Sequence, residues 1–222
     1  MPIIQTILAS LAFAFSNWKK LIEVSIFPLL MAFPFMTTLP EMTVVDLQAL
    51  LFGIAENQTY PWLYLLYMLM FEYGYIAILI NVYRLVVSGG ASVARFGVVL
   101  PSIRMGRFFV LYFLLSIVLR LPLFFNSLLL IPVVYFLLIP YALNLVSIAN
   151  DIPYKKIKLP ARVQLSVFLI KLGVPAFLVA LVILIGAEFI FWGAMIIIIY
   201  WMAISFALCY RVIVANNSAQ IL

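Results

Sequence analysis

The chain of 222 residues is 68% hydrophobic and 9% charged, whereas an ordinary soluble domain is about 45–50% apolar and about 25% charged. This composition excludes a soluble globular protein. The net charge of +6 is spread among apolar neighbours instead of forming a nucleic-acid-binding arm, and zero His with one Cys excludes Cys/His metal sites, disulfide frameworks and His-dependent catalysis.

The first 20 residues are expected to form a short amphipathic helix that lies in the membrane interface. Apolar side chains recur there at helical spacing, and Trp18, Lys19 and Lys20 follow them as interfacial anchors. A secretory signal would have the reverse order, with basic residues ahead of the apolar stretch. A longer, tilted first span is the alternative. Just inside that span, Glu23 is explained by an ion pair with Lys19 at i,i+4 spacing.

Six stretches then meet the length that a membrane-spanning helix needs, which is about 20 apolar residues for a hydrocarbon core about 30 Å thick. They cover about residues 21–39, 60–83, 108–125, 128–149, 172–190 and 191–214. A tight turn near Glu188 to Gly193 is expected to separate the last two. Residues 41–56 have an apolar helical stripe and are expected to form a short helix on the outer surface. The sequence therefore predicts an all-α polytopic integral membrane protein, a single domain over residues 1–222 with six transmembrane helices preceded by a short interfacial helix.

The basic residues predict the orientation, because Lys and Arg resist translocation and gather on the cytoplasmic side. With the N-terminus inside, every basic residue except Arg120 falls in a cytoplasmic segment, Lys171 being assigned to the inner loop before the fifth span. Both termini are therefore expected in the cytoplasm, with the protein in a bacterial inner membrane. Several of these cations are expected to attract anionic lipid headgroups, at roughly 1 kcal/mol each: Lys19, Lys20, Arg84, Arg95, Arg104, Arg107, Lys155, Lys156 and Lys158.

Besides Glu23 and Arg211 near the inner ends of their spans, three charged residues fall within predicted spans, where a charge near the bilayer centre costs at least about 2.5–3.5 kcal/mol. Glu72 is near the midplane of the second span, Arg120 is in the outer half of the third, and Glu188 is at the outer end of the fifth. Spans joined by one loop are antiparallel neighbours, so Glu72 and Arg120 are expected to form a buried pair. This pair is either a structural salt bridge or part of a centre between helices two, three and five that binds an ion, a proton or a charged headgroup. We prefer the structural interpretation because nothing else titratable joins the pair.

Prolines also fall within the predicted spans, at positions 28, 34, 122, 132, 140 and 175. Each removes a backbone hydrogen bond and bends its helix. Transporters use such breaks to expose backbone carbonyls to a substrate. Kinked packing without a transport role is the equally acceptable alternative, because membrane helices tolerate proline in general.

The order of these features also suggests a family. An N-terminal amphipathic segment ends in Trp18 and Lys19, and Leu-Pro pairs with a nearby Arg precede the third and fifth spans, at residues 100–104 and 159–162. This layout resembles bacterial six-span membrane proteins that include the membrane domain associated with glycerophosphodiester phosphodiesterases. Many of those have Arg followed by a Leu-Leu-Gly-Glu-like turn after the second span, where this chain reads RLVVSGG at 84–90, without an acidic residue. The resemblance implies a six-span fold and transfers no functional residue.

Three functions are compatible with the sequence. The preferred one is a non-catalytic subunit that packs against other membrane subunits in a larger complex, with lipids as further partners and no nucleic acid. The alternative is a transporter for small solutes or lipids, or its substrate-binding component, with the polar centre at Glu72 and Arg120. An enzyme acting on lipids ranks last, because the sequence has no catalytic cluster and no motif for a cofactor or metal.

Overall fold

The protein is mostly helical over the residues that its structure, a computed structural model, describes. These are residues 3–38, 61–90, 93–100, 102–124, 127, 129–152, 159–185 and 188–219, and some side chains within the helices lie outside the description. The expected outer helix at 41–56 also lies outside it. The elements are α1 (Ile3–Ser16), α2 (Trp18–Thr38), α4 (Pro61–Ser88), the 3-10 turn η2 (Arg95–Gly97), α5 (Ile103–Phe124), α6 (Leu130–Ala149), α7 (Ala161–Phe168), the π-helical segment η3 (Leu169–Gly173), α8 (Val174–Ile185) and α9 (Glu188–Ala219).

Six helical segments are long and apolar enough to cross a membrane, and they confirm the predicted fold class. They are Trp18–Thr37, Leu65–Ser88, Met105–Leu123, Leu130–Ala149, Ala161–Leu181 and Ile196–Val214. Their lengths match the roughly 20 residues that a hydrocarbon core of about 30 Å requires. The expected short N-terminal helix precedes them as α1.

The fifth span begins earlier than predicted. Helix α7 starts at Ala161, directly after Pro160, and continues through η3 and α8 to Ile185. Its first two turns contain polar residues, so the apolar stretch that predicts this span begins later than the helix does. Lys171, which we expected in an inner loop, therefore lies inside the fifth helix.

The boundary between the last two spans also differs from the expected one. Helix α8 ends at Ile185 and α9 begins at Glu188, so the tight turn expected from Glu188 to Gly193 is wrong. Gly193 lies within α9, because glycine is tolerated in membrane helices.

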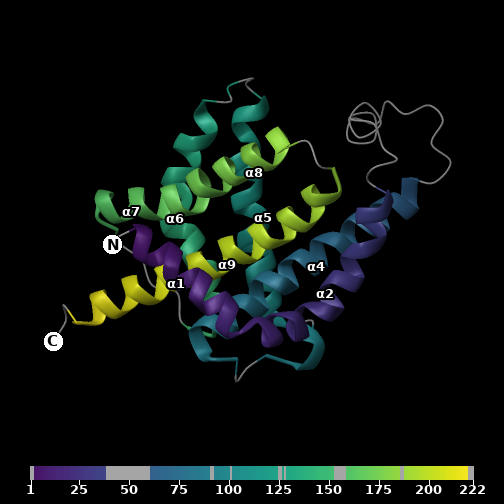
Figure 1. The fold of residues 1–222 in the computed structure, drawn as a ribbon, viewed down its shortest axis with the longest axis horizontal. Coiled ribbons are helices and arrows are strands. Elements are labelled where there is room, and N and C mark those ends of the chain that lie inside the picture. Colours follow the sequence, from purple (N-terminus) through teal and green to yellow (C-terminus); the bar gives the residue numbers. More distant parts are fainter. Residues whose placement is uncertain are drawn as a thin grey trace.

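Helices α4 and α9 form the centre of the bundle. Helix α4 contacts α2, α6 and α9, and α9 also contacts α1, α8 and η3. In the α9 span 56% of residues are buried, against 11% in the α5 span. The Tyr83 ring of α4 lies between Phe108 of α5 and Phe206 of α9, with both pairs of ring centroids 6.3 Å apart. Figure 1 shows α9 crossing the middle of the molecule, with α2 and α4 together on one side.

Helices α2 and α4 pack closely because Gly74 has no side chain. A Cβ atom at this position would collide with the carbonyl oxygen of Pro28. Close backbone approach strengthens helix association in lipid, where van der Waals packing replaces the hydrophobic effect as the driving force. Further along the same interface, the Phe35 and Phe71 rings meet with centroids 5.0 Å apart.

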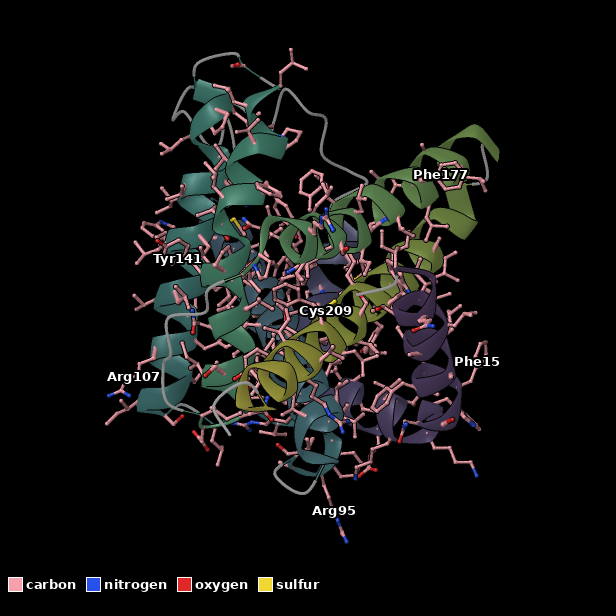
Figure 2. The ribbon with its side chains drawn as sticks, turned by 90° about the vertical axis from the view of Figure 1, so that its left-hand side faces the viewer. Phe15, Arg95, Arg107, Tyr141, Phe177 and Cys209 are labelled. Carbon is pink, nitrogen blue, oxygen red and sulfur yellow. The ribbon has the colours of Figure 1, made fainter. Side chains whose placement is uncertain are left out.

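Helix α1 turns its polar side inward. Thr6 and Ser10 are buried, and α1 packs mainly on α9. Several of its large apolar side chains point outward, with Ile4 71% and Phe15 78% exposed, whereas Ile3, Ile7 and Phe13 pack partly against the core. Figure 2 shows Phe15 on the outer edge of the molecule. This distribution is the reverse of a soluble helix and fits a helix surrounded by lipid. Its location in the membrane interface stays a prediction.

Candidate functional site

Basic side chains gather at one end of the bundle, called the basic end and defined by Lys19, Lys20, Arg84, Arg95, Arg107 and Arg211. Figure 2 shows Arg95 and Arg107 pointing outward at this end. Lys20 lies beside Gly90, just after the last turn of α4. Arg104 lies in the first turn of α5, but its side chain is outside the described residues, as are Lys155, Lys156 and Lys158.

Two arginines of the basic end bind the C-terminal ends of neighbouring helices. The Arg84 Nε donates a hydrogen bond to the carbonyl of Ala149, the last residue of α6, at 2.8 Å. The Arg211 Nη1 donates to the carbonyl of Val86, in the last turn of α4, at 3.3 Å. Carbonyls at helix C-termini have no intrahelical donor, and the helix dipole attracts a cation there. Both arginines therefore fix helix ends, in addition to any attraction for lipid headgroups.

Asparagine side chains connect the same helix ends. Ser88 Oγ donates to Asn150 Oδ1 at 2.6 Å, and Asn150 Nδ2 donates to the carbonyl of Val146 at 2.9 Å. Asn81 is buried in α4, and its Nδ2 donates to the carbonyl of Gly97 at 2.7 Å. These bonds hold the 93–100 loop and the end of α6 against α4.

The ion pair near the start of α2 joins a different lysine from the one expected. Lys20 Nζ lies 3.2 Å from Glu23 Oε2, an i,i+3 pair, whereas we expected Lys19 to pair with Glu23. Both spacings place side chains on one helix face. Lys19 instead has its ammonium 5.7 Å from the centre of the Trp18 ring.

Glu72 and Arg120 lie near each other without contact. They are close enough to interact electrostatically, yet no ion pair within 4.0 Å joins these two described side chains. Glu72 is half-buried on α4, whereas Arg120 is exposed on α5. Glu188 is the first residue of α9, and its side chain is outside the described residues. A binding centre formed by all three residues stays a prediction.

A cluster of tyrosines connects Glu72 to the interior of the bundle. The tyrosine cluster consists of Tyr75 and Tyr83 of α4, Tyr112 of α5 and Tyr135 of α6, each of which lies within electrostatic range of at least one other member. The Tyr75 and Tyr112 rings have centroids 5.9 Å apart, and both residues are within range of Glu72. Hydroxyl groups thus extend from the Glu72 side into the space between α4, α5 and α6.

Lys171 lies in the π-helical segment of the fifth helix. The Val174 N–H donates to the carbonyl of Leu169, the i→i−5 bond that defines a π-helix. Pro175 explains this geometry, since it has no N–H to give to the Lys171 carbonyl and its ring would clash with that carbonyl in an α-helix. Single-turn π-helices occur frequently at functional sites.

The Lys171 ammonium packs on an aromatic ring. Its Nζ lies 3.6 Å from the centre of the buried Phe206 ring, a cation–π contact, and Cys209 on the next turn of α9 is within electrostatic range. Figure 2 shows Cys209 in the interior of the molecule. Among the described residues no carboxylate lies within 4.0 Å of this ammonium.

Lys171 also lines a cavity of about 120 Å³ between α5, α6 and the fifth helix. Three hydroxyl-bearing side chains share the wall, namely Tyr112 and Ser116 of α5 and Tyr135 of α6. The rest of the lining is aliphatic: Leu115, Leu119, Leu138, Ile139, Ala142 and Leu145. Because these lining residues come from the middle turns of α5 and α6, the cavity lies within the membrane-spanning part of the bundle.

Sequence reasoning missed the Lys171 cavity because it placed Lys171 outside the membrane. The Leu-Pro pair at 159–160, read as the start of a helix, would have included Lys171 in the span. The Gly173 and Pro175 that follow were a second signal for an irregular turn. The tyrosines gave no such signal, since aromatic residues are frequent throughout this chain.

The chain matches no family model, no curated protein and no solved structure in the comparisons made. The layout resemblance to six-span bacterial proteins therefore stays a prediction. Within the RLVVSGG segment the structure does show local roles. Arg84 binds the end of α6, and α4 ends before Gly89 and Gly90, whose φ angles of +65° and +82° suit glycine.

Proposed function

We propose that the protein is a non-catalytic membrane protein that binds a lipid or small solute within the bilayer, as a transporter or as the substrate-binding component of one. The observation that carries this proposal is Lys171, a cation inside a membrane-spanning helix that lines a cavity with three hydroxyl-bearing side chains. An ionisable residue within a membrane span is by default a candidate for a substrate pathway or a binding site.

The energetics of Lys171 support a ligand. A lysine at this depth costs at least about 2.5–3.5 kcal/mol on insertion scales. The contact with Phe206 offsets about 0.5–2 kcal/mol of that cost. No carboxylate among the described residues supplies the remainder. An anion or a polar solute in the cavity would offset the rest of the cost of burying Lys171. Ligand binding would therefore explain why a lysine lies inside this span.

Lys171 also bears on whether Glu72 forms a structural salt bridge with Arg120 or belongs to a binding centre. The structural interpretation was preferred because nothing titratable joined Glu72 and Arg120. The tyrosine cluster now connects Glu72 to Tyr112, and Tyr112 lines the same cavity as Lys171. Glu72 thus acts on a hydroxyl of the cavity that Lys171 lines, an arrangement that favours binding over a simple salt bridge.

We infer further that the basic end faces the cytoplasm, with both termini on that side and the protein in a bacterial inner membrane. The grouping of Arg95 and Arg107 at one end supports the orientation, because basic residues resist translocation. The layout resemblance supports the choice of membrane.

Native mass spectrometry of the full chain purified in mild detergent tests the proposed function. We expect a non-protein ligand to remain bound to the wild type and to be lost from Lys171→Gln at equal membrane abundance. Arg162→Gln, which removes an exposed cation from the first turn of the same helix, is the matched control and should retain the ligand. The proposal would be contradicted if the purified wild-type protein carried no ligand and was always recovered with a stoichiometric partner protein.

An accessory subunit of a larger complex is the second candidate, and the α5 surface favours it. Only 11% of the α5 span is buried, and Arg120 is exposed on this helix inside the span. A protein partner would shield that charge from lipid. A photo-crosslinking residue at Ile117, one turn from Arg120 and 44% exposed, should then capture one stoichiometric partner. Crosslinks to lipid alone would remove this candidate.

A further inference from the structure

We propose that the Lys171 cavity binds the anionic head of an amphiphile, a carboxylate or phosphate attached to an apolar chain. This inference rests on the proposed function and names the ligand class for the same region of the molecule. The cavity lies between α5, α6 and η3, and none of its walls depends on residues outside the described part of the chain.

The donors around the cavity determine the sign of the ligand's charge. The Lys171 ammonium has hydrogen-bond donors and no acceptor, so it favours an anion, whereas the hydroxyls of Tyr112, Ser116 and Tyr135 can donate or accept and adapt to the bound group. Ser116 is within hydrogen-bonding reach of Tyr112 on the same face of α5, so the two hydroxyls are held together. Hydrogen bonds from a charged donor to an anion are among the strongest in proteins. A cationic head would meet the lysine at close range and be repelled.

The surrounding charges leave Lys171 as the uncompensated one. Glu72 and Arg120 both lie within electrostatic range of Tyr112, where Glu72 acts more strongly, but neither is among the groups that act on Lys171. Phe206 occupies one side of the Lys171 ammonium, at 3.6 Å from the ring centre. The neighbouring Cys209 is buried and does not supply a carboxylate. The remaining direction is the cavity itself, so an anion placed there would neutralise the lysine.

The size and lining of the cavity indicate an amphiphile instead of a free ion. A volume of about 120 Å³ accommodates a carboxylate or phosphate group but not a long hydrocarbon chain. The aliphatic wall residues, such as Leu119 and Leu138, would be in contact with the first methylenes of a chain. The cavity is partly open, and large apolar side chains such as Leu137 are exposed on the outer face of α6. A chain leaving the cavity would therefore reach lipid without crossing a polar barrier.

Photo-labelling of the purified full chain in mild detergent tests this inference. The probe is palmitic acid with a photoactivatable diazirine on its chain, and peptide mass spectrometry locates the adducts. We expect adducts on the cavity-lining stretches of α5 and α6. Palmitate and dodecyl phosphate should compete with the probe, whereas methyl palmitate and inorganic phosphate should not. Lys171→Gln should reduce labelling about tenfold or more, since it removes a charged hydrogen-bond donor.

Two further variants separate binding from folding. Lys171→Arg keeps the charge and should retain a substantial part of the labelling. Arg162→Gln, which removes an exposed cation from the first turn of the same helix, should change it less than about twofold, as expected for a surface residue away from the cavity. Removing a desolvated cation should leave Lys171→Gln at least as heat-stable as the wild type, so reduced labelling with an unchanged Tm supports the site. Equal labelling of the wild type and Lys171→Gln would overturn it.

The remaining outcomes distinguish this inference from the proposed function. Competition by methyl palmitate as strong as by palmitate overturns the requirement for an anionic head. Competition by inorganic phosphate overturns the requirement for an apolar chain. If the wild type is not labelled but keeps another ligand that depends on Lys171, the inference fails and the proposed function stands. If neither probe nor native ligand binds, both fail.

Discussion

Gly97 is a single residue on which the loop between α4 and α5 depends. Its φ of +73° is in the left-handed region, and a Cβ atom there would collide with the carbonyl oxygen of Val24 in α2. The buried Asn81 donates to the Gly97 carbonyl. The backbone of this loop thus contacts two helices at a point that only glycine can occupy. The sequence shows the glycine, but the contact with Val24 could not be predicted from it, because Val24 and Gly97 are far apart in the chain.

Replacing Gly97 with alanine should destabilise the protein by about 2 kcal/mol or more, from the left-handed backbone and the collision with Val24. Gly106→Ala is the matched control. Gly106 lies in α5 with open space where a Cβ would be, so alanine should stabilise that helix by about 0.5–1 kcal/mol. Thermal unfolding in detergent, followed with a thiol-reactive dye on the single buried Cys209, measures both. Equal Tm values for the two variants would refute the collision.

The hydroxyl group of Tyr73, a residue of α4, also holds the loop between α4 and α5 against that helix. Its OH donates to the carbonyl of Val99 at 2.8 Å. Tyr73→Phe removes this bond and leaves the ring, and should cost about 1 kcal/mol. Tyr141→Phe, on the outer face of α6 where the side chain is 53% exposed, should have little effect. The comparison uses the same dye assay, and a larger loss for Tyr141→Phe would show that the bond to Val99 contributes nothing.

At the scale of elements, the six spans could be predicted from the length of their apolar stretches. Each helix that crosses a bilayer needs enough apolar residues to cover the hydrocarbon core. Start and end residues were predicted less well, since they depend on caps and contacts instead of on apolar length. The fifth helix shows why. Its first turns contain Arg162 and Gln164, and Gln164 donates to the carbonyl of Phe136 on α6 at 2.6 Å, so a polar turn is stabilised by a neighbour that the sequence does not reveal. The depth of Lys171 was missed for the same reason.

The π-helical turn around Lys171 should depend on Pro175. Pro175→Ala supplies the missing N–H to the Lys171 carbonyl and permits a regular α-helix, which rotates Lys171 relative to the cavity. We expect a higher Tm together with weaker photo-labelling by the diazirine probe. Pro132→Ala is the control, because Pro132 is in the first turn of α6, where backbone N–H groups have no intrahelical acceptor. Unchanged labelling in Pro175→Ala would contradict a role for the π-helical turn in placing Lys171.

At the scale of the whole molecule, the sequence predicted neighbours by chain order, and the structure shows a less regular arrangement. Helices α4 and α5 were expected to be joined by an ion pair, yet they meet through aromatic rings, Tyr75 with Tyr112 and Tyr83 with Phe108. The closest backbone approach near Gly74 is between α2 and α4 instead. Helix contacts in lipid follow from small residues and shape, which chain order does not encode.

The orientation of the whole molecule can be measured with one cysteine at a time. In a Cys209→Ser background, Arg95→Cys should react with a membrane-impermeant maleimide only after the inner face is exposed, because Arg95 is exposed at the basic end. A cysteine at Asp46, in the expected outer loop, should react in intact cells. Labelling of Arg95→Cys in intact cells would reverse the orientation and the inferred location of both termini.

The contact between α1 and α9 has a consequence for biosynthesis. The buried hydroxyl-bearing residues of α1, Thr6 and Ser10, face the bundle, and Ser25 of α2 is hydrogen-bonded to Tyr200 of α9. During translation the segments that supply these surfaces are separated by nearly the entire chain. Until α9 emerges from the ribosome, the earliest helices would have to wait in the bilayer with hydroxyls facing lipid. The packing of α1 and α2 against α9 is therefore a late step in folding. Variants at Tyr200 should accumulate as chains that are inserted in the membrane but sensitive to proteolysis.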